Sequence, residues 1–208
     1  MNKTVIGVLA SGRGSNLQAI VDAIEAGRLD AKIGAVISDN PEANVLKRMA
    51  ASDIPTICID RRQFARRQEF EAAVAEELNI RHVELVVLAG FMRILSSYFI
   101  DRFAGKIMNI HPALLPAFPG EDAQQQAVDY GAKVSGCTVH FVDEGMDTGP
   151  IILQEAVPVL EDDTAETLSE RILHAEHILY PRALALYCDG RLKVEGRRVQ
   201  ISEASSDK

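Results

Sequence analysis

The first half of the chain alternates short runs rich in β-branched residues with longer amphipathic stretches. This alternation is typical of successive β-α units around a parallel sheet. Strands are predicted at residues 5–9, 32–38, 56–59, 85–89 and 106–110, and helices at 16–26, 43–52, 62–78 and, as a short element, 98–103. Apolar residues recur at helical spacing at Leu17, Ile20, Val21 and Ile24, so this helix is expected to pack on the sheet.

The pattern changes after His111. The segment at 111–120 reads HPALLPAFPG, and its prolines exclude a helix or a central strand, so we expect an irregular loop. A helix follows near 123–131. Strands at 134–142 and 150–158 are joined by DEGMDTG, which suits an antiparallel connection. Asp162, Asp163 and Thr164 are candidate N-caps of a final helix that ends near Tyr187.

The whole pattern predicts an α/β fold with a mostly parallel central sheet, helices on both faces and antiparallel strands in the C-terminal part. We find no internal repeat or linker, so residues 1–202 are expected to form a single domain, followed by a disordered tail at 203–208. The length of 208 residues and the hydrophobic content of 47% are sufficient for one compact core.

The formal net charge of -8 argues against nucleic acid or an anionic membrane as the main partner, because the overall field repels polyanions. Three cysteines that are far apart in sequence do not predict a disulfide framework or a zinc site. The apolar run at 5–10 is too short for a signal peptide or a membrane span. These features together favour a cytoplasmic protein with small-molecule partners.

A glycine-rich loop follows the first predicted strand and reads ASGRGSN at residues 10–16. The N–H groups at the start of the following helix would be unpaired, and Gly12 and Gly14 would let an anion approach the backbone. The loop lacks the third glycine of a dinucleotide fingerprint and the Gly-Lys-Ser/Thr of a P-loop, so a single phosphomonoester is the preferred ligand. A purely structural use of the glycines, for close helix packing, stays open.

Two polar residues, Asn109 and His111, are two positions apart at the end of the fifth predicted strand. They should therefore project from the same face, while Met108 and Ile110 face the other way. The carboxyl end of such a strand is where α/β sheets bind ligands. An amide donor beside a histidine suits stabilisation of an oxyanion when an amine attacks a carbonyl. Asp147, in the connection between the two antiparallel strands, could approach the same place, although a structural histidine and a turn-capping aspartate remain alternatives.

Four ordered motifs span nearly the whole chain: SGRGSN, VVLAGFMRILS at 86–96, NIHPALLP at 109–116 and VHFVDEGMDTGPII at 139–152. In this combination the chain resembles the phosphoribosylglycinamide formyltransferases of the folate-dependent purine pathway. The resemblance implies a Rossmann-like formyltransferase fold, with a phosphate-binding half at 1–105 and a catalytic and folate-binding half at 106–190. It also implies formyl transfer from 10-formyltetrahydrofolate to glycinamide ribonucleotide, with no metal.

The resemblance assigns roles residue by residue. Asn109, His111 and Asp147 match the catalytic trio. Gly14, Ser15, Asn16 and Glu176 match the ribonucleotide-binding residues, and the folate-binding residues are matched by Arg67, Arg93, Ile94, Leu95, Val142, Asp143 and Glu144. Without the resemblance, Glu176 could equally lie on a solvated helix face and Arg67 in an exposed basic patch.

One segment departs from the family. Many members have histidines after the proline loop, whereas this chain has Gly120-Glu121-Asp122. If this loop closes over the substrates, its contacts must differ from those of the family, and the added negative charge beside a phosphate is unfavourable unless the side chains turn outward; no catalytic role is assigned to Asp122. A sibling formyltransferase acting on another amine, a formyltetrahydrofolate hydrolase and a non-catalytic phosphosugar sensor are the alternatives. The two enzyme alternatives usually have an additional domain, for which this sequence shows no candidate. Both monomer and homodimer are compatible with the sequence.

Overall fold

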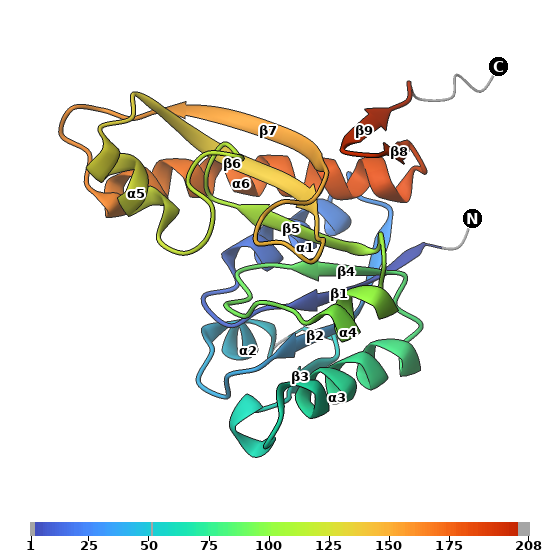
Figure 1. Cartoon of the computed structure of the whole chain (residues 1–208). Helices are drawn as coiled ribbons and strands as arrows, with labels where there is room; N and C mark the ends of the chain where they lie inside the picture. Colours follow the sequence, from blue (N-terminus) through green and yellow to red (C-terminus); the bar gives the residue numbers. More distant parts are fainter. Residues whose placement is uncertain (1–2, 51, 204–208) are drawn as a thin grey trace.

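The computed structural model describes residues 3–50 and 52–203 of the chain. One sheet, in the order β3-β2-β1-β4-β5-β6-β7-β9-β8, runs through these residues (Figure 1). Its strands are β1 (Thr4–Leu9), β2 (Ala31–Ser38), β3 (Thr56–Cys58), β4 (Leu85–Leu88), β5 (Ile107–His111), β6 (Val134–Phe141), β7 (Ile151–Pro158), β8 (Leu192–Glu195) and β9 (Arg198–Ile201). Strands β1 to β5 pair in parallel, and β6 is antiparallel to both β5 and β7. The predicted α/β architecture is therefore confirmed.

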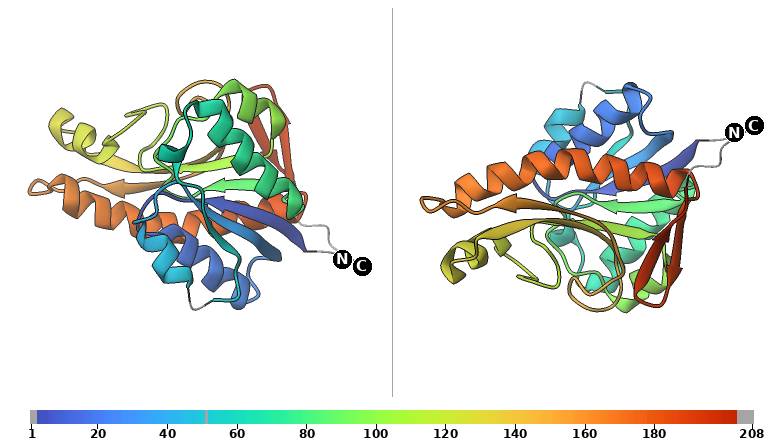
Figure 2. Two further views of the ribbon diagram at one scale, coloured as in Figure 1. Left: turned by 90° about the horizontal axis from the view of Figure 1, so that it is seen from below. Right: turned by 90° about the horizontal axis from the view of Figure 1, so that it is seen from above.

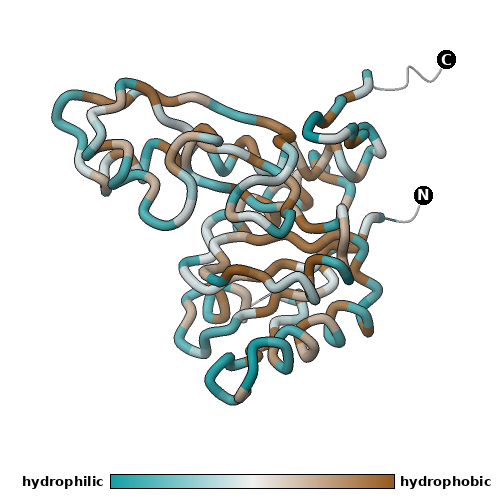
Figure 3. Tube along the Cα trace, viewed as in Figure 1, coloured by the Kyte–Doolittle hydropathy of each residue, from teal (hydrophilic) through white to brown (hydrophobic). Residues whose placement is uncertain are grey.

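Helices cover both faces of the sheet. The helices are α1 (Ser15–Glu25), α2 (Asn44–Met49), α3 (Arg67–Ile80), α4 (Ser97–Arg102), α5 (Ala123–Tyr130) and α6 (Ala165–Cys188). Figure 2 shows α1 and α2 on one side of the sheet and α3 and α4 on the other. Apolar residues of α1, α2, α5 and α6 form one core cluster, and those of α3 and α4 form a second. The hydropathy colouring of Figure 3 shows apolar segments concentrated along the central strands.

Alternation along β5 orients the polar residues. Met108 and Ile110 belong to the core cluster shared with α6, whereas Ile107 belongs to the opposite cluster. Because successive side chains of a strand point to opposite faces, Asn109 and His111 lie on the side of Ile107. This placement confirms that the two polar residues share a face.

A tyrosine from α6 donates hydrogen bonds to two central strands. Tyr180 is fully buried, and its hydroxyl lies 2.9 Å from both Leu88 O and Met108 O. Burial raises its pKa well above the ordinary value, so the hydroxyl stays a neutral hydrogen-bond donor. The contact holds the end of β4 and the first half of β5 in a fixed relation. The helix that provides it runs to Cys188, close to the predicted end at Tyr187, and Thr164 is its N-cap, as expected.

Three local features differ from the sequence prediction or were not covered by it. The helix predicted from residue 62 begins only at Arg67, because Asp60 accepts a hydrogen bond from Arg62 N and stabilises a separate 3-10 turn, η1 (Arg61–Gln63). The β8–β9 hairpin was not predicted. Of the predicted disordered tail, residues 204–208 lie outside the described part of the chain.

No helix in the described ranges is both long and apolar enough to cross a membrane.

Candidate active site

A cleft of about 710 Å³ opens at the carboxyl ends of β1, β4 and β5. Its size is in the range of small-molecule sites. The anion loop, defined as residues 12–16, and the polar residues at the end of β5 both line it. The topology explains this convergence, because parallel strands that are neighbours in the sheet end at the same edge. The anion loop and the end of β5 therefore share one cleft.

The anion loop has the backbone geometry of a helix N-terminus that faces the cleft. Gly14 is the N-cap of α1 and adopts a left-handed conformation with φ of 74°. Having no side chain, it cannot cap the first turn itself, so the N–H groups of that turn remain available to an anion. Val45 N donates to Gly12 O at 3.0 Å, and Met92 N donates to Ser11 Oγ at 3.0 Å. The loop is thereby fixed to the chain on both sides.

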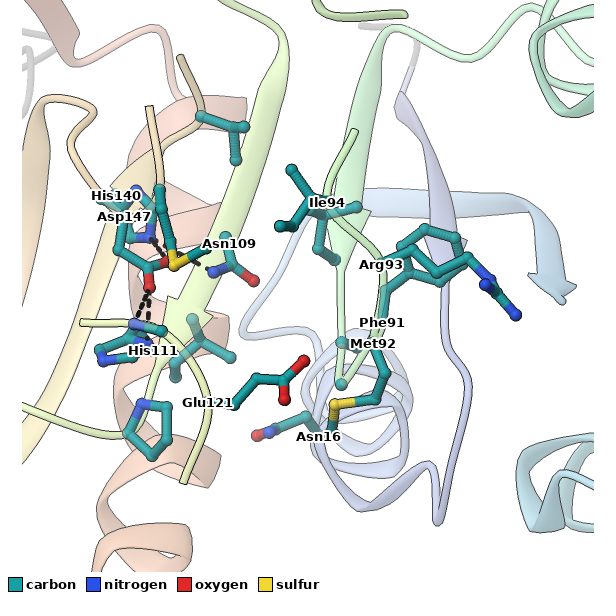
Figure 4. A pocket seen from close by; sticks show the side chains of 18 of the residues that line it. Asn16, Phe91, Met92, Arg93, Ile94, Asn109, His111, Glu121, His140 and Asp147 are labelled. Atoms are coloured by element: carbon teal, nitrogen blue, oxygen red, sulfur yellow. Dashed lines mark hydrogen bonds and ion pairs between the residues drawn. The ribbon is translucent and has the colours of Figure 1, made fainter. Parts of the chain in front are cut away.

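His111 and Asp147 form a close pair, as the sequence suggested. His111 Nδ1 lies 3.3 Å from Asp147 Oδ2, and the imidazole is only 4% exposed. The other ring nitrogen, Nε2, lies 2.8 Å from Phe118 O. Since both ring nitrogens face oxygen acceptors, donation from the two nitrogens satisfies both contacts. Figure 4 shows this pair on one wall of the cleft.

Asn109 lies beside a second histidine, which the sequence reasoning did not select. His140 is paired with Asn109 across β5 and β6, and the distance from Asn109 Nδ2 to His140 Nε2 is 3.3 Å. His140 Nδ1 donates to Phe141 O at 2.8 Å, so Nε2 of the neutral ring can accept from the amide. Burial lowers the pKa of His140, while the hydrogen bond to Phe141 O and the charge of Asp147 oppose that shift. A neutral His140 therefore orients the Asn109 amide.

His140 also completes a connected polar group. Its Nε2 lies 3.7 Å from Asp147 Oδ1, so Asp147 stands between the two histidines. We refer to Asn109, His111, His140 and Asp147 as the polar cluster (Figure 4). The run Val139-His140-Phe141 gave only an alternating strand pattern, and the strand register that places His140 opposite Asn109 is a tertiary feature.

Glu176 connects α6 to the anion loop. Its Oε2 accepts a hydrogen bond of 2.7 Å from Asn16 Nδ2, and the residue is 6% exposed. Burial raises the pKa of Glu176, although the hydrogen bond from Asn16 and the charge of Arg13 act in the opposite direction. Glu176 is thus not a solvated surface residue, and both partners line the cleft.

The opposite wall of the cleft is largely apolar. It is formed by the segment after β4, whose apolar members are Phe91, Met92, Ile94 and Leu95. The loop after β6, which also carries Asp147, adds the apolar residues Val142 and Met146 to the cleft. Such a surface suits a flat heteroaromatic ring that needs apolar contact on its faces and hydrogen bonds at its edge.

The predicted folate-binding residues of this wall do not all lie in the cleft. Arg93 lines it, but its guanidinium points away from the polar cluster and contacts the carboxylate of buried Asp39 (Figure 4). Arg67 is outside the lining and instead donates to the Ile94 carbonyl and to Glu71. The structure therefore gives Arg67 the position of a support behind the wall.

The loop after β6 holds Asp143, Glu144 and Asp147 on the cleft. Asp143 Oδ1 accepts hydrogen bonds from Gly145 N at 3.1 Å and from Thr148 Oγ1 at 2.6 Å. These bonds close the loop on itself and fix the backbone that carries Asp147. In residues 3–50 and 52–203, no group of three His, Cys, Asp or Glu side chains is arranged to hold a metal ion.

Comparisons with known proteins agree with this arrangement. Residues 4–184 match the family model described as formyl transferase. The phosphoribosylglycinamide formyltransferase of Bacillus subtilis is 46% identical over 85% of this chain and 91% of its own length. The trifunctional purine biosynthetic protein adenosine-3 of Drosophila melanogaster is 48% identical over 89% of this chain, which spans only 14% of that longer protein.

A solved structure gives the same result for the fold. Glycinamide ribonucleotide transformylase 1 from Symbiobacterium toebii superposes with a TM-score of 0.95 at 50% identity, covering 97% of this chain and 95% of that one. The fold and the similarity over nearly the full length agree. The chain belongs to the formyl transferase family, among the phosphoribosylglycinamide formyltransferases.

Proposed function

We propose that this protein transfers the formyl group of 10-formyltetrahydrofolate to the amine of glycinamide ribonucleotide in purine biosynthesis. The observation that carries the proposal is the shared cleft, which joins a backbone anion site to the polar cluster. A phosphorylated amine held at the first could present its nitrogen at the second. Orientation of two substrates combined with electrostatic stabilisation is sufficient for acyl transfer to an amine.

Asn109 and His111 are proposed to stabilise the oxygen of the formyl group as the amine attacks its carbon. This oxygen gains negative charge when the carbon becomes tetrahedral, and donors aimed at it lower the barrier. His140 accepts one N–H of the Asn109 amide, leaving the second N–H for the formyl oxygen. His111 Nε2 is in contact with Phe118 O, so the formyl oxygen must replace this carbonyl at the ring.

Asp147 is proposed to orient His111 and to receive a proton, through water, from the attacking amine. Its Oδ2 is 3.3 Å from His111 Nδ1, which supports the first role. A carboxylate so placed also stabilises the positive charge of the protonated imidazole. The proton released by the amine is then passed to the nitrogen of the departing folate.

The ribonucleotide phosphate is assigned to Gly14, Ser15 and Asn16, with Glu176 beside them. For folate, Ile94, Leu95 and Val142 would provide apolar contact, and the peptide groups near Asp143 and Glu144 would provide hydrogen bonds. Folate supplies the activated formyl group. Arg93 remains a candidate for its acidic tail, whereas Arg67 would act through the Ile94 carbonyl that it holds.

Turnover by the purified protein tests the function. Incubation with glycinamide ribonucleotide and a 10-formylfolate donor should give an absorbance increase from the deformylated folate and a formylated ribonucleotide detectable by mass spectrometry. Tight ribonucleotide binding without turnover would favour the sensor. Release of formate without need of the amine would favour a hydrolase.

Replacement of Ser15 and Asn16 by alanine tests the assignment of the anion loop. The variants should bind the ribonucleotide about tenfold more weakly, because a hydrogen bond to a charged group contributes about 1.5–3 kcal/mol. Titration calorimetry with each substrate separately measures the effect. A selective loss of folate affinity would show that the loop serves the other substrate.

A further inference from the structure

The Gly120-Glu121-Asp122 segment brings a carboxylate to the cleft. Turned outward, its two carboxylates would avoid the repulsion of a bound phosphate. Glu121 instead belongs to the cleft lining, and Figure 4 shows its carboxylate pointing from the loop across the cleft toward Asn16. Asn16 of the anion loop and Asn109 of the polar cluster line the same cleft, and the view of Figure 4 draws Glu121 between them.

The backbone around Glu121 is fixed on both sides. Gly120 N donates to Asp147 Oδ2 at 2.8 Å, so the segment is bonded to the polar cluster. Gln126 Nε2, from α5, donates to Glu121 O at 2.7 Å and to Pro119 O at 3.1 Å. These bonds fix the backbone that carries the Glu121 side chain, which is exposed at the cleft.

The charge of Glu121 is not balanced by a neighbouring cation. Among the described residues, none of the ion pairs within 4.0 Å includes Glu121. Of the two arginines in the cleft lining, Arg93 contacts Asp39. An unpaired carboxylate near a phosphate site is repelled by the phosphate. This repulsion is offset if the same ligand also carries hydrogen-bond donors that reach the Glu121 carboxylate.

We propose that Glu121 is a specificity determinant that accepts hydrogen bonds from the amine substrate, at the part between the phosphate and the attacking nitrogen. This inference rests on the proposed function. Two groups of that substrate have the required chemistry: the ribose hydroxyls and the amine itself. A site that pairs a buried or ligand-covered acceptor with a substrate donor discriminates strongly against analogues that lack the donor.

Binding of the ribonucleotide to E121L and E121Q tests the proposal, with D129N as the control. Asp129 is an exposed carboxylate of α5 outside the cleft lining, so D129N removes one negative charge near the segment and leaves the cleft unchanged. E121L should bind glycinamide ribonucleotide about tenfold more weakly or worse, E121Q should be intermediate, and D129N should equal the wild type. Folate affinity should be unchanged in all three.

Two substrate analogues distinguish the donor groups. If the hydroxyls are recognised, an analogue lacking the ribose 2′- and 3′-hydroxyls will bind equally to E121L and wild type. If the amine is recognised, an analogue with hydrogen in place of the amine will bind equally to E121L and wild type. E121L binding that equals or exceeds wild-type binding would overturn the proposal, because it would leave only repulsion by Glu121.

The same series separates this inference from the proposed function. Wild-type turnover is measured in parallel: a wild type without formyl transfer contradicts the function, whereas unimpaired ribonucleotide binding by E121L contradicts only the role of Glu121. Should E121L fail to fold, the result with the nearly isosteric E121Q decides, since wild-type affinity in this variant would oppose recognition by a charged acceptor.

Discussion

The anion loop and the polar cluster face the same cleft but use different parts of the chain. The anion loop offers backbone N–H groups at the start of α1, held in place by the conformation of Gly14. The polar cluster offers side chains from β5, β6 and the loop after β6, joined by the Asn109–His140 contact and by the proximity of Asp147 to both imidazoles. Backbone donors do not titrate, whereas histidines do. Binding at the loop should therefore respond to changes of conformation, and chemistry at the cluster to changes of protonation.

The largest effect is expected for D147N in the polar cluster. Asparagine preserves the size of the side chain but removes the charge that faces His111, so kcat should fall about a hundredfold or more while ribonucleotide affinity stays nearly unchanged. Steady-state kinetics and calorimetry measure the two quantities. Equal losses in binding and turnover would give Asp147 a structural role. The polar cluster would then no longer differ from the anion loop in acting on the chemical step alone.

A smaller effect is expected for G14A in the anion loop. The left-handed φ of 74° costs an alanine about 1–2 kcal/mol, and its Cβ would lie 2.7 Å from Val45 Cγ2. Ribonucleotide affinity should fall about tenfold, because the first turn of α1 must shift, and kcat at saturation should change little. Affinity is measured by calorimetry and stability by urea denaturation.

Gly27, beyond the other end of α1, provides the matched control for G14A. It also has a left-handed φ, of 68°, but open space around its Cβ position. G27A should lower the free energy of unfolding without changing ribonucleotide affinity. Equal weakening of binding by both variants would mean that general loss of stability, and not the shape of the anion loop, explains the G14A result.

The smallest effect concerns the pH dependence of stability. Burial lowers the pKa of His140 below its ordinary value of 6.5, so between the two values the unfolded state binds more protons than the folded state. The free energy of unfolding should therefore decrease as pH falls below about 6.5, by at most about 1.4 kcal/mol per pH unit. Glu176 has a raised pKa and contributes in the opposite direction.

The difference between wild type and H140N isolates the histidine. Urea denaturation of both proteins at pH 7.5 and 5.5 should show a steeper loss of stability in the wild type. Asp147, Asp143 and His111 affect the pKa of His140 in both directions, but burial is the largest influence. Parallel pH profiles of the two proteins would show that His140 is not kept neutral by the fold.

Much of the fold could be predicted from the chain, because its signals are local. Short strand-like runs gave β1 to β7; those of β1 and β4 are continuously apolar because both of their faces are buried. Helical spacing gave α1 and α6, since the pattern reflects the burial of one face of the helix. The 3-10 turn at η1 escaped prediction because it depends on a hydrogen bond that Arg62 N donates to the Asp60 side chain. The hairpin β8–β9 is short and lies at the sheet edge, where little burial marks the pattern.

The sequence alone determined the residue types at the cleft and the strand ends that carry them, because periodicity fixes the face to which a side chain points. Tertiary structure decided which residues meet: His140 reaches Asn109 through the β5–β6 register, Arg67 lies behind the cleft wall, and the backbone that carries Glu121 is bonded to Asp147 and α5. Such contacts join residues far apart along the chain, and no local pattern records the hydrogen bonds that select them.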